Sequence, residues 1–477
     1  MYQSDTICAI ATSLNSSGIG IIRISGEDAI SFADSIFRGK NKLADCETHT
    51  IQYGHIYDNE ELVDEVLVLI MRGPRSYTTE DVIEIHCHGG ILVLKKVLSL
   101  LVSVGCRIAE PGEFTKRAFL NGRIDLSEAE SIMDLISSNS ELAMKNSVKQ
   151  LSGSLRDIIV DLRDKILYET AYIESALDDP EHYDLTGYPD DLKNKVDSMI
   201  SRIDDLINSF NSGHILKEGI NTLILGKPNA GKSSLLNTLS RRERAIVTDI
   251  PGTTRDTLEE QITINGVSLN IIDTAGIRET DDIVEKIGVD KALDSIDDAD
   301  LILFVIDSSR PLDGDDEFII SKIIDKKVII LLNKSDLLSV ITEEDICNKY
   351  NKPVISFSSV SLDGLKTLES TITDMFFSGQ VKSDETLYIT NSRQASCLVN
   401  AKNSLSNVLM SIDNMMPEDF FSIDLMDAYN FLGEITGETI EDDLANKIFS
   451  EFCMGKWYDF SNEMKKISYQ EQMKFIF

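Results

Sequence analysis

Residues 226–233 read Gly-Lys-Pro-Asn-Ala-Gly-Lys-Ser, the pattern of a loop that binds phosphate groups. Glycines at both ends allow such a loop to turn its backbone N–H groups toward phosphates at a helix N-terminus. The apolar run at 221–225 predicts a strand before the loop, and residues 234–239 predict a helix after it. In that context Lys232 reaches the β- and γ-phosphates, and Ser233 can ligate Mg²⁺. The alternative, a chance glycine-rich turn, does not account for the strand and the helix.

A second motif can bind the metal ion and the γ-phosphate. Residues 273–276 read Asp-Thr-Ala-Gly and follow the apolar run at 269–272. Asp273 can hold Mg²⁺ through a water molecule, and Gly276 can offer its N–H to the γ-phosphate. Alone this short motif is weak evidence, and its place after the phosphate loop strengthens it.

A third motif can read the base. Residues 333–336 read Asn-Lys-Ser-Asp and follow the apolar run at 328–332. The Asp336 carboxylate can accept two hydrogen bonds from the N–H edge of guanine, an edge that adenine lacks. Ser358 and Ser359 follow a further expected strand and could support the base through a main-chain N–H. The three motifs in this order predict a domain that binds GTP rather than ATP.

The segment between the first two motifs is expected to respond to the nucleotide. Residues 248–256 read Thr-Asp-Ile-Pro-Gly-Thr-Thr-Arg-Asp, and Thr254 is our candidate to complete the Mg²⁺ shell. Such a loop would be ordered by GTP and released after hydrolysis. Ile277 stands where Ras-like enzymes have a glutamine that orients water, so that role must come from elsewhere. Charged residues that follow are Arg278, Glu279 and Glu285, for which a solvated loop is the alternative.

The residues expected to contact GTP or its metal ion come from all of these segments. They are Asn229, Ala230, Gly231, Lys232, Ser233, Ser234, Thr248, Asp249, Ile250, Pro251, Gly252, Thr253, Thr254, Asp273, Thr274, Ala275, Gly276, Asn333, Lys334, Asp336, Ser358 and Ser359.

These motifs resemble those of the TrmE–Era–EngA group of GTPases, and the rest of the chain resembles the MnmE (TrmE) family of tRNA modification GTPases. The group is indicated by residues 226–237, 245–256 and 273–278. The family is indicated by residues 5–12, 20–26 and 111–130, and by Cys-Met-Gly-Lys at 453–456. The resemblance covers residues 1–456.

The resemblance implies a GTPase that uses bound K⁺ in place of an arginine finger. Asn229 matches the family's side-chain ligand for K⁺, and Thr248, Ile250 and Thr253 match the further contacts of the ion. Glu285 matches the glutamate that orients the attacking water. Two of these domains meet across this face in the family, so hydrolysis is expected to depend on dimerisation. A cation placed between phosphates can offset the charge that develops during transfer.

The N-terminal region resembles the folate-binding fold of one-carbon transfer proteins. In the family it dimerises and binds a tetrahydrofolate derivative of the 5-formyl or 5,10-methylene type, and the matching residues are Arg23, Glu80, Arg123 and Lys456. An acid can pair with the N–H edge of the pterin, and arginines can pair with carboxylates of the glutamate tail. Without the resemblance these would be ordinary solvated charges.

The chain departs from the family after Lys456, where most members stop. Here 21 residues continue, and they include three lysines and several aromatic residues. This extension, residues 457–477, could shield or displace Lys456. It is a solvated tail, a small packing helix or an arm that contacts RNA, and we favour the first two.

Composition limits the partners and the compartment. The chain has 46 basic and 80 acidic residues, a net charge of −34, which opposes broad binding to a phosphate backbone. Contact with tRNA must therefore come from local basic patches or from a partner protein. Seven cysteines without a Cys-x-x-Cys pair suit a reducing compartment. Because neither a signal peptide nor a membrane-length apolar run is visible, we expect a cytoplasmic protein that does not bind a membrane.

The expected fold is multidomain, with α/β and all-α parts. Residues 1–121 form an α/β domain of the folate-binding type, residues 122–216 and 381–456 form a helical domain, and residues 217–380 form an inserted Ras-like G domain. Asn265-Gly266 predicts a hairpin between flanking strands. Apolar residues at helical spacing predict the bundle core; they are Ile132, Leu135, Ile136, Leu151, Leu155, Ile158, Ile159 and Leu162, and later Leu398, Leu405, Val408, Leu409 and Ile412.

The resemblance implies a homodimeric, K⁺-stimulated GTPase that forms a heterotetramer with the FAD protein MnmG (GidA). Together they would add an aminomethyl-type group at C5 of the wobble uridine of certain tRNAs, with folate as the source of carbon and FAD held by the partner alone. One alternative is a GTP-switched assembly factor for ribosomes or other RNA. Another is a scaffold without useful turnover. Specific binding of tetrahydrofolate would favour the modification enzyme.

Overall fold

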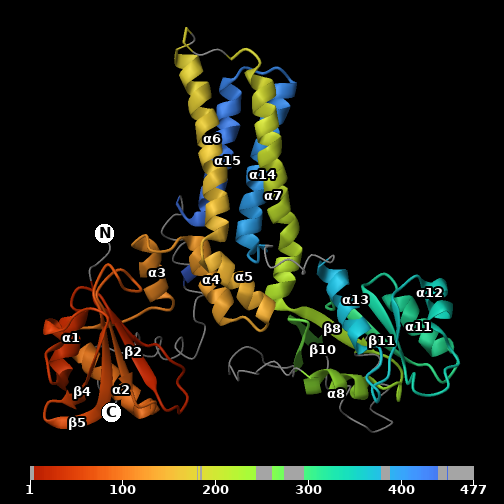
Figure 1. Cartoon of the computed structure of the whole chain (residues 1–477), viewed down its shortest axis with the longest axis horizontal. Helices are drawn as coiled ribbons and strands as arrows, with labels where there is room; N and C mark the ends of the chain where they lie inside the picture. Colours follow the sequence, from red (N-terminus) through yellow and green to blue (C-terminus); the bar gives the residue numbers. More distant parts are fainter. Residues whose placement is uncertain are drawn as a thin grey trace. The chain divides into compact units, whose positions relative to one another are not determined.

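The computed structural model describes residues 5–179, 181–182, 185–242, 260–272, 295–377, 387–438 and 448–449 (Figure 1). The chain divides into two compact units. One is formed by residues 1–133 with 436–477, and the other by residues 134–435. In the described parts both α/β and all-α architecture are present, so the expected multidomain fold class is confirmed. Within them, no helix combines the length and the apolar character needed to cross a bilayer.

The first unit is built on a seven-stranded sheet in the order β3-β4-β5-β6-β2-β1-β7. Its neighbouring strands are antiparallel, except that β1 pairs with β7 in parallel. The strands are β1 (Ile7–Ile10), β2 (Gly20–Ser25), β3 (Phe37–Gly39), β4 (Thr50–Asp58), β5 (Glu61–Met71), β6 (Val82–Cys87) and β7 (Arg107–Ile108). The helices are α1 (Ala29–Ile36), η1 (Leu43–Asp45), α2 (Ile91–Ser103), α3 (Glu113–Leu120) and α4 (Leu126–Ile136), the last of which runs into the second unit.

Helices α1 and α2 bury one face of this sheet, because alternate strand residues and the inward faces of the two helices form one apolar cluster. The other face keeps apolar side chains accessible. Ile51 and Tyr53 of β4 and Leu67 of β5 are 61%, 59% and 44% exposed, and Tyr53 lies directly opposite Leu67 in the sheet. A sheet face of this kind can accommodate another protein surface.

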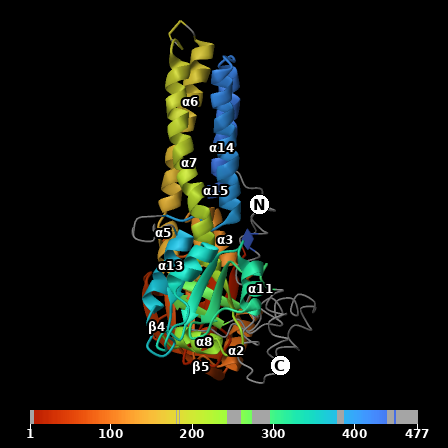
Figure 2. The same ribbon diagram turned by 90° about the vertical axis from the view of Figure 1, so that its right-hand side faces the viewer.

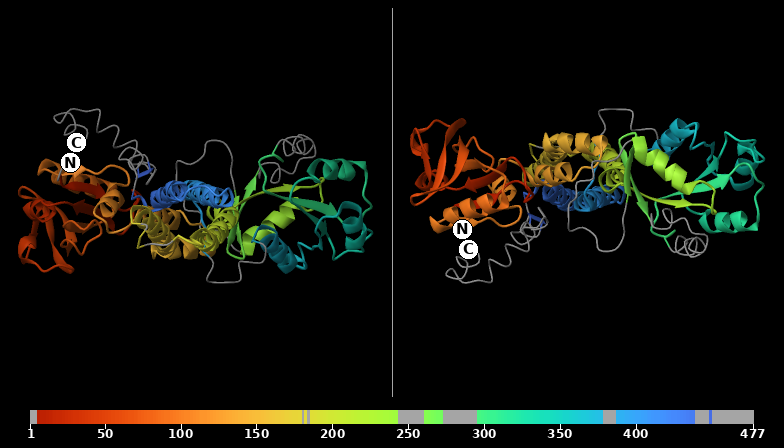
Figure 3. Two further views of the ribbon diagram at one scale, coloured as in Figure 1. Left: turned by 90° about the horizontal axis from the view of Figure 1, so that it is seen from above. Right: turned by 90° about the horizontal axis from the view of Figure 1, so that it is seen from below.

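The second unit contains a bundle of long helices. They are α5 (Glu141–Leu151), α6 (Ser154–Asp178), α7 (Tyr188–Glu218), α14 (Ser392–Asp413) and α15 (Asp419–Thr436). In Figures 2 and 3 the blue helices α14 and α15 lie beside the yellow α6 and α7, although they are far apart in the sequence. The predicted stripes at 155–162 and 398–412 contribute to this core. Two residues of α4 were wrongly assigned to it. Ile132 packs against a separate cluster that includes Ala118 and Leu126, and Ile136 ends the helix and is 69% exposed.

The rest of the second unit is an α/β domain with a six-stranded sheet, in the order β13-β12-β11-β8-β10-β9. All pairs are parallel apart from β9 with β10. The strands are β8 (Ile220–Leu225), β9 (Glu260–Ile264), β10 (Val267–Ile272), β11 (Leu301–Asp307), β12 (Val328–Asn333) and β13 (Val354–Ser356). The helices are α8 (Lys232–Arg242), α11 (Gly314–Ile323), α12 (Glu343–Tyr350) and α13 (Leu365–Phe377).

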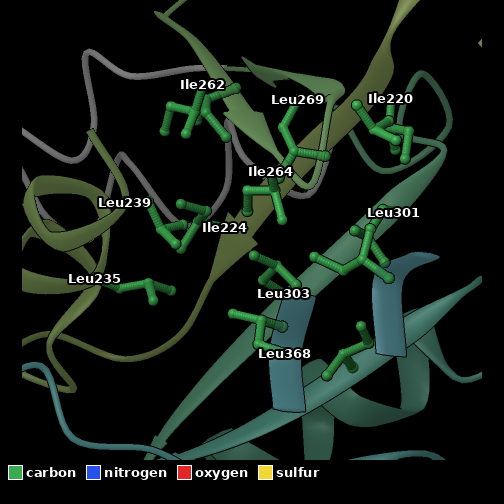
Figure 4. Close-up of a cluster of buried hydrophobic side chains, with 14 of the residues drawn as sticks. Ile220, Ile224, Leu235, Leu239, Ile262, Ile264, Leu269, Leu301, Leu303 and Leu368 are labelled. Carbon is green, nitrogen blue, oxygen red and sulfur yellow. The ribbon is translucent and has the colours of Figure 1, made fainter. Parts of the chain in front are cut away.

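Every residue of β11 and of β12 is buried, as expected for central parallel strands covered on both faces. Helices α8 and α13 pack on one face, and Figure 4 shows Leu235, Leu239 and Leu368 among the strand side chains of that cluster. Helices α11 and α12 cover the other face. The predicted hairpin is confirmed: β9 and β10 are joined by Asn265 and Gly266, whose φ angles of 49° and 77° suit a tight two-residue turn.

The α/β domain is inserted between α7 and α14, and the chain's return into the bundle is held by hydrogen bonds. The Asn146 side chain accepts from the backbone N–H of Tyr388 (3.0 Å) and donates to its carbonyl oxygen (3.0 Å). Gln150 also donates to that carbonyl at 2.8 Å. Gly213 of α7 makes room for the same segment, because a Cβ there would lie 2.0 Å from the Ile389 carbonyl oxygen.

Candidate functional site

The phosphate loop lies between the end of β8 at Leu225 and the start of α8 at Lys232. Gly226 and Gly231 have φ angles of 151° and 103°, which side-chain-bearing residues rarely adopt. A Cβ on Gly226 would lie 2.4 Å from the Val305 carbonyl oxygen, and one on Gly231 would lie 2.0 Å from Asn333 Nδ2. The loop therefore requires glycine at both positions, and it leads directly into a helix N-terminus suited to phosphate.

Lys232 and Asn229 are two polar residues of this loop with distinct conformations. The Lys232 ammonium group donates to the carbonyl oxygens of Gly226 (2.7 Å) and Lys227 (2.9 Å), which places the charge within the loop itself. Asn229 has a φ of 61°, a left-handed conformation that asparagine adopts more readily than most residues. Ala230 follows it and is buried. The loop thus presents a cation and an amide where a polyphosphate is expected.

The base-reading motif follows β12 and is joined to the phosphate loop. Asn333 is buried, and its Nδ2 donates to the Ala230 carbonyl oxygen at 2.8 Å. Ser359 Oγ donates to Asn333 Oδ1 at 3.4 Å. Asn333 therefore ties the predicted phosphate and base sites into one surface, a role that the spacing of the motifs did not reveal.

A serine holds the carboxylate that we expect to read guanine. Ser358 Oγ donates to Asp336 Oδ1 at 2.7 Å, and it accepts from the backbone N–H groups of Val360 and Ser361, each at 3.2 Å. From the sequence, only a main-chain contact to the base was expected in this segment. The structure adds a side-chain role for Ser358, which fixes the direction of the Asp336 carboxylate.

Asp307 is a functional candidate that sequence reasoning missed. It is the last residue of β11 and lies opposite Asn333 in the sheet register. Its carboxylate accepts from Lys334 Nζ at 2.5 Å, and from the Ser309 hydroxyl (2.6 Å) and N–H (3.0 Å). Burial acts to raise the pKa of Asp307, but the hydrogen bonds from Lys334 and Ser309 outweigh it and hold the pKa below its ordinary value. Its position at the carboxyl edge of a parallel sheet, where ligands bind, was the available signal.

We expect Asp307→Asn to weaken the binding of GTP and GDP about tenfold, because a charge-assisted hydrogen bond to Lys334 is replaced by opposed donors. The asparagine oxygen can still accept from Ser309, so the thermal midpoint should change little. Fluorescence titration with a labelled guanine nucleotide measures the affinity. The matched control is Asp297→Asn, which removes a carboxylate paired with Lys326 at 2.8 Å elsewhere in the domain. Equal affinities in both variants would show that Asp307 does not position Lys334.

Several predicted site residues lie outside the described residues, and their placement stays a prediction. They are Thr248, Asp249, Ile250, Pro251, Gly252, Thr253, Thr254, Asp273, Thr274, Ala275, Gly276, Glu285 and Lys456.

In the first unit, residues from three separate segments meet around one aromatic ring. The guanidinium carbons of Arg23 (β2) and Arg123 (after α3) lie 5.1 and 4.8 Å from the centre of the Tyr77 ring. Glu80 follows three residues later in the loop between β5 and β6. The predicted ligand-binding residues Arg23 and Arg123 are therefore brought together, and Glu80 belongs to the same loop as the ring that they contact. Sequence reasoning did not identify Tyr77 at their centre.

A buried arginine and a serine hold the Glu80 carboxylate. Arg117 Nη1 donates to both Glu80 oxygens at 3.1 and 3.2 Å, and Ser25 Oγ donates to Oε2 at 2.6 Å. Arg117 is 5% exposed and also contacts Asp5 (2.8 Å) and Glu113 (3.1 Å). Burial favours a higher pKa for Glu113, but its hydrogen bonds and the charges of Arg107 and Arg117 leave the pKa below its usual value. Arg117 and Ser25 thus keep the Glu80 carboxylate, which would recognise a ligand, in one orientation.

Known proteins resemble this chain over nearly its whole length. A family model described as "GTP-binding protein TrmE N-terminus" matches residues 6–123, and one described as "MnmE helical domain" matches residues 126–453. A protein of Lachnoclostridium phytofermentans named tRNA modification GTPase MnmE is 58% identical over 457 residues, which cover 95% of this chain and 100% of that protein. Proteins of the same name from Clostridioides difficile and Acetivibrio thermocellus are each 48% identical over 96% of this chain and 100% of their own length.

Proposed function

This chain belongs to the MnmE family of tRNA modification GTPases, and we propose that its GTP hydrolysis serves the modification of the wobble uridine of certain tRNAs. The observation that supports this most is the nucleotide surface of the α/β domain. There Asn333 joins the phosphate loop to the base-reading motif, and Ser358 orients the Asp336 carboxylate. Lys232 would bind the β- and γ-phosphates, and Asp336 would accept from the guanine edge.

We propose that this site binds Mg²⁺ and K⁺, because the residues expected around the phosphates offer oxygen ligands. Hydroxyl, amide and main-chain oxygens are hard ligands of the kind that Mg²⁺ and K⁺ prefer. Ser233 and Thr254 would hold Mg²⁺, and Asn229 with the segment 248–253 would hold K⁺. When bound, K⁺ supplies positive charge near the phosphates that an arginine supplies in other GTPases. In the chain itself, Glu285 would orient the attacking water, because Ile277 cannot.

The protein would act as a homodimer. The accessible apolar face of β4 and β5, with Ile51, Tyr53 and Leu67, supports a homodimer formed through the first unit. The α/β domains would meet when GTP is bound, so that hydrolysis depends on the dimer. The FAD protein MnmG would complete a heterotetramer and supply the redox chemistry.

The first unit is proposed to bind a tetrahydrofolate derivative of the 5-formyl or 5,10-methylene type, which would supply the carbon. Glu80, held by Arg117 and Ser25, would accept from a pterin N–H edge. Arg23 and Arg123 lie at the same ring and carry the charge that suits the ligand's carboxylates. Lys456 would be a further contact.

The test combines this protein with its flavoprotein partner, GTP, a tetrahydrofolate one-carbon donor, an ammonium salt as the source of the amine nitrogen, and unmodified tRNA. Mass analysis of the wobble nucleoside should show the added group in K⁺. Glu80→Gln is the matched variant, since it keeps size but loses charge; it should lose the folate-derived carbon and keep GTP turnover. Absence of both folate binding and nucleoside modification, together with co-sedimentation of the protein with ribosomes, would instead favour the assembly factor.

A further inference from the structure

We propose that Tyr77 is a positioning residue that holds the Arg123 guanidinium group as the receptor for a carboxylate of the ligand's glutamate tail. This inference rests on the tetrahydrofolate site proposed above and assigns the two ends of that ligand to different residues. Glu80 would take the pterin, and Arg123 would take the tail. Tyr77 would set the position of the Arg123 guanidinium group.

Arg123 is held by Tyr77 in two ways. Its Nη1 donates to the Tyr77 carbonyl oxygen at 3.0 Å, and its guanidinium carbon lies 4.8 Å from the centre of the Tyr77 ring. The electron-rich face of an aromatic ring attracts a cation at that distance. The Arg123 backbone is also fixed, because its N–H donates to the Ala118 carbonyl oxygen at 2.9 Å. A long side chain that would otherwise sample many rotamers is therefore pre-organised.

The charge balance singles out Arg123 as the anion receptor. Arg23 already has an acidic partner, since its guanidinium group lies 2.8 Å from Glu84 Oε1. Arg117 is occupied by Glu80, Glu113 and Asp5. Within the described ranges of the chain, Arg123 forms no ion pair with a carboxylate, and the residue is exposed. An incoming carboxylate would therefore meet the least compensated positive charge at this site.

The Tyr77 ring is itself held in place. Its hydroxyl group lies 3.0 Å from Thr115 Oγ1, and Asn121 Nδ2 donates to the neighbouring Thr78 carbonyl oxygen at 2.6 Å. Because Tyr77 and Glu80 belong to the same short loop, one loop sets the spacing between the acid for the pterin and the arginine for the tail. The ring contacts both Arg123 and Arg23, but Arg23 is also held by its ion pair with Glu84, whereas Arg123 depends on Tyr77. The hydroxyl only steadies the ring.

The experiment compares Tyr77→Leu and Tyr77→Phe in the full-length chain, with two probes measured by calorimetry and displacement. One probe is 5-formyltetrahydrofolate, and the other is the same compound without its glutamate. Tyr77→Leu should weaken the binding of the complete compound about tenfold, because the attraction between ring and cation is lost. It should change the binding of the shortened compound less than twofold. Tyr77→Phe keeps the ring and should match the wild type with both probes.

A double-mutant cycle with Arg123→Gln gives a second readout. If Tyr77 acts through Arg123, Tyr77→Leu should have no further effect on affinity once Arg123 is replaced. Equal weakening of both probes by Tyr77→Leu, or an additive effect in the cycle, would overturn the inference. So would unchanged affinity for the complete compound. Failure of the wild-type protein to bind either probe would instead refute the folate site itself. As a control for folding, each variant should retain the GTP turnover of the wild type.

Discussion

Asp336→Asn is expected to exchange guanine for xanthine as the preferred base. The Asp336 carboxylate, oriented by Ser358 at 2.7 Å, would accept from both N–H groups on the guanine edge. An asparagine would place its own N–H₂ against the guanine amino group, which leaves opposed donors in contact. Xanthine carries a carbonyl oxygen at that position, and this oxygen can accept from the asparagine. A site built on such hydrogen bonds rejects a mismatched partner strongly, so GTP affinity should fall on the order of 10³-fold or more.

Competition between labelled GDP and unlabelled XDP measures this exchange directly. The asparagine oxygen can still accept from Ser358, so the local geometry should be preserved. The matched control is Asp325→Asn, which removes a carboxylate of the same domain outside the site and should leave both affinities unchanged. If the Asp336 variant bound GDP as the wild type does, or lost both nucleotides equally, Asp336 would not be the residue that reads the base.

Turnover of GTP is expected to be at least tenfold faster in K⁺ than in Na⁺ at equal ionic strength, and Asn229→Ala should abolish this difference. An arginine finger, whose place K⁺ would take, contributes about 10³- to 10⁵-fold to the rate in other GTPases. Loss of the Asn229 side chain removes one oxygen ligand of the ion. Initial rates of phosphate release in the two salts, measured over a range of protein concentrations, give the result.

The backbone at Asn229 makes a second variant necessary. Its φ of 61° is unfavourable for alanine by about 1–2 kcal/mol, so Asn229→Ala alone would change the loop as well as the ligand. Asn229→Gly removes the amide and tolerates the same backbone. Both variants should lose K⁺ stimulation. If the glycine variant kept K⁺ stimulation, the loss in Asn229→Ala would be an effect of the backbone. Equal wild-type rates in both salts would rule out the K⁺ mechanism.

Features set by neighbouring residues were predictable from the sequence. The phosphate loop, the strands around it and the hairpin at Asn265 depend on short patterns of glycine, apolar residues and turn residues, and the structure has them where they were expected. The bundle core followed from helical spacing. Ile136 shows the limit of that approach, because spacing alone does not tell where a helix leaves the core.

Contacts between distant segments could not be predicted in this way. Asp307 meets Lys334 because β11 and β12 end at the same edge of the sheet, and only the register places them together. Arg117 reaches Glu80 from α3, and Ser25 reaches it from β2. Nothing in the spacing of these residues specifies that they share a carboxylate. The sequence therefore indicated the binding groups, whereas the residues that orient them required tertiary structure.

The insertion of the α/β domain between α7 and α14 has a consequence for how the protein is made. Roughly 170 residues separate the two helices, so at about 5–20 residues per second a ribosome needs on the order of 10 to 30 seconds to supply α14 after α7. During that interval the apolar stripe of α6 and α7, with Ile166, Val196 and Ile203, lacks the helices that bury it in the finished bundle. The α/β domain is complete at α13 and can fold first. The hairpin of α6 and α7 is therefore most exposed to aggregation and to chaperone binding in the interval before α14 is synthesised.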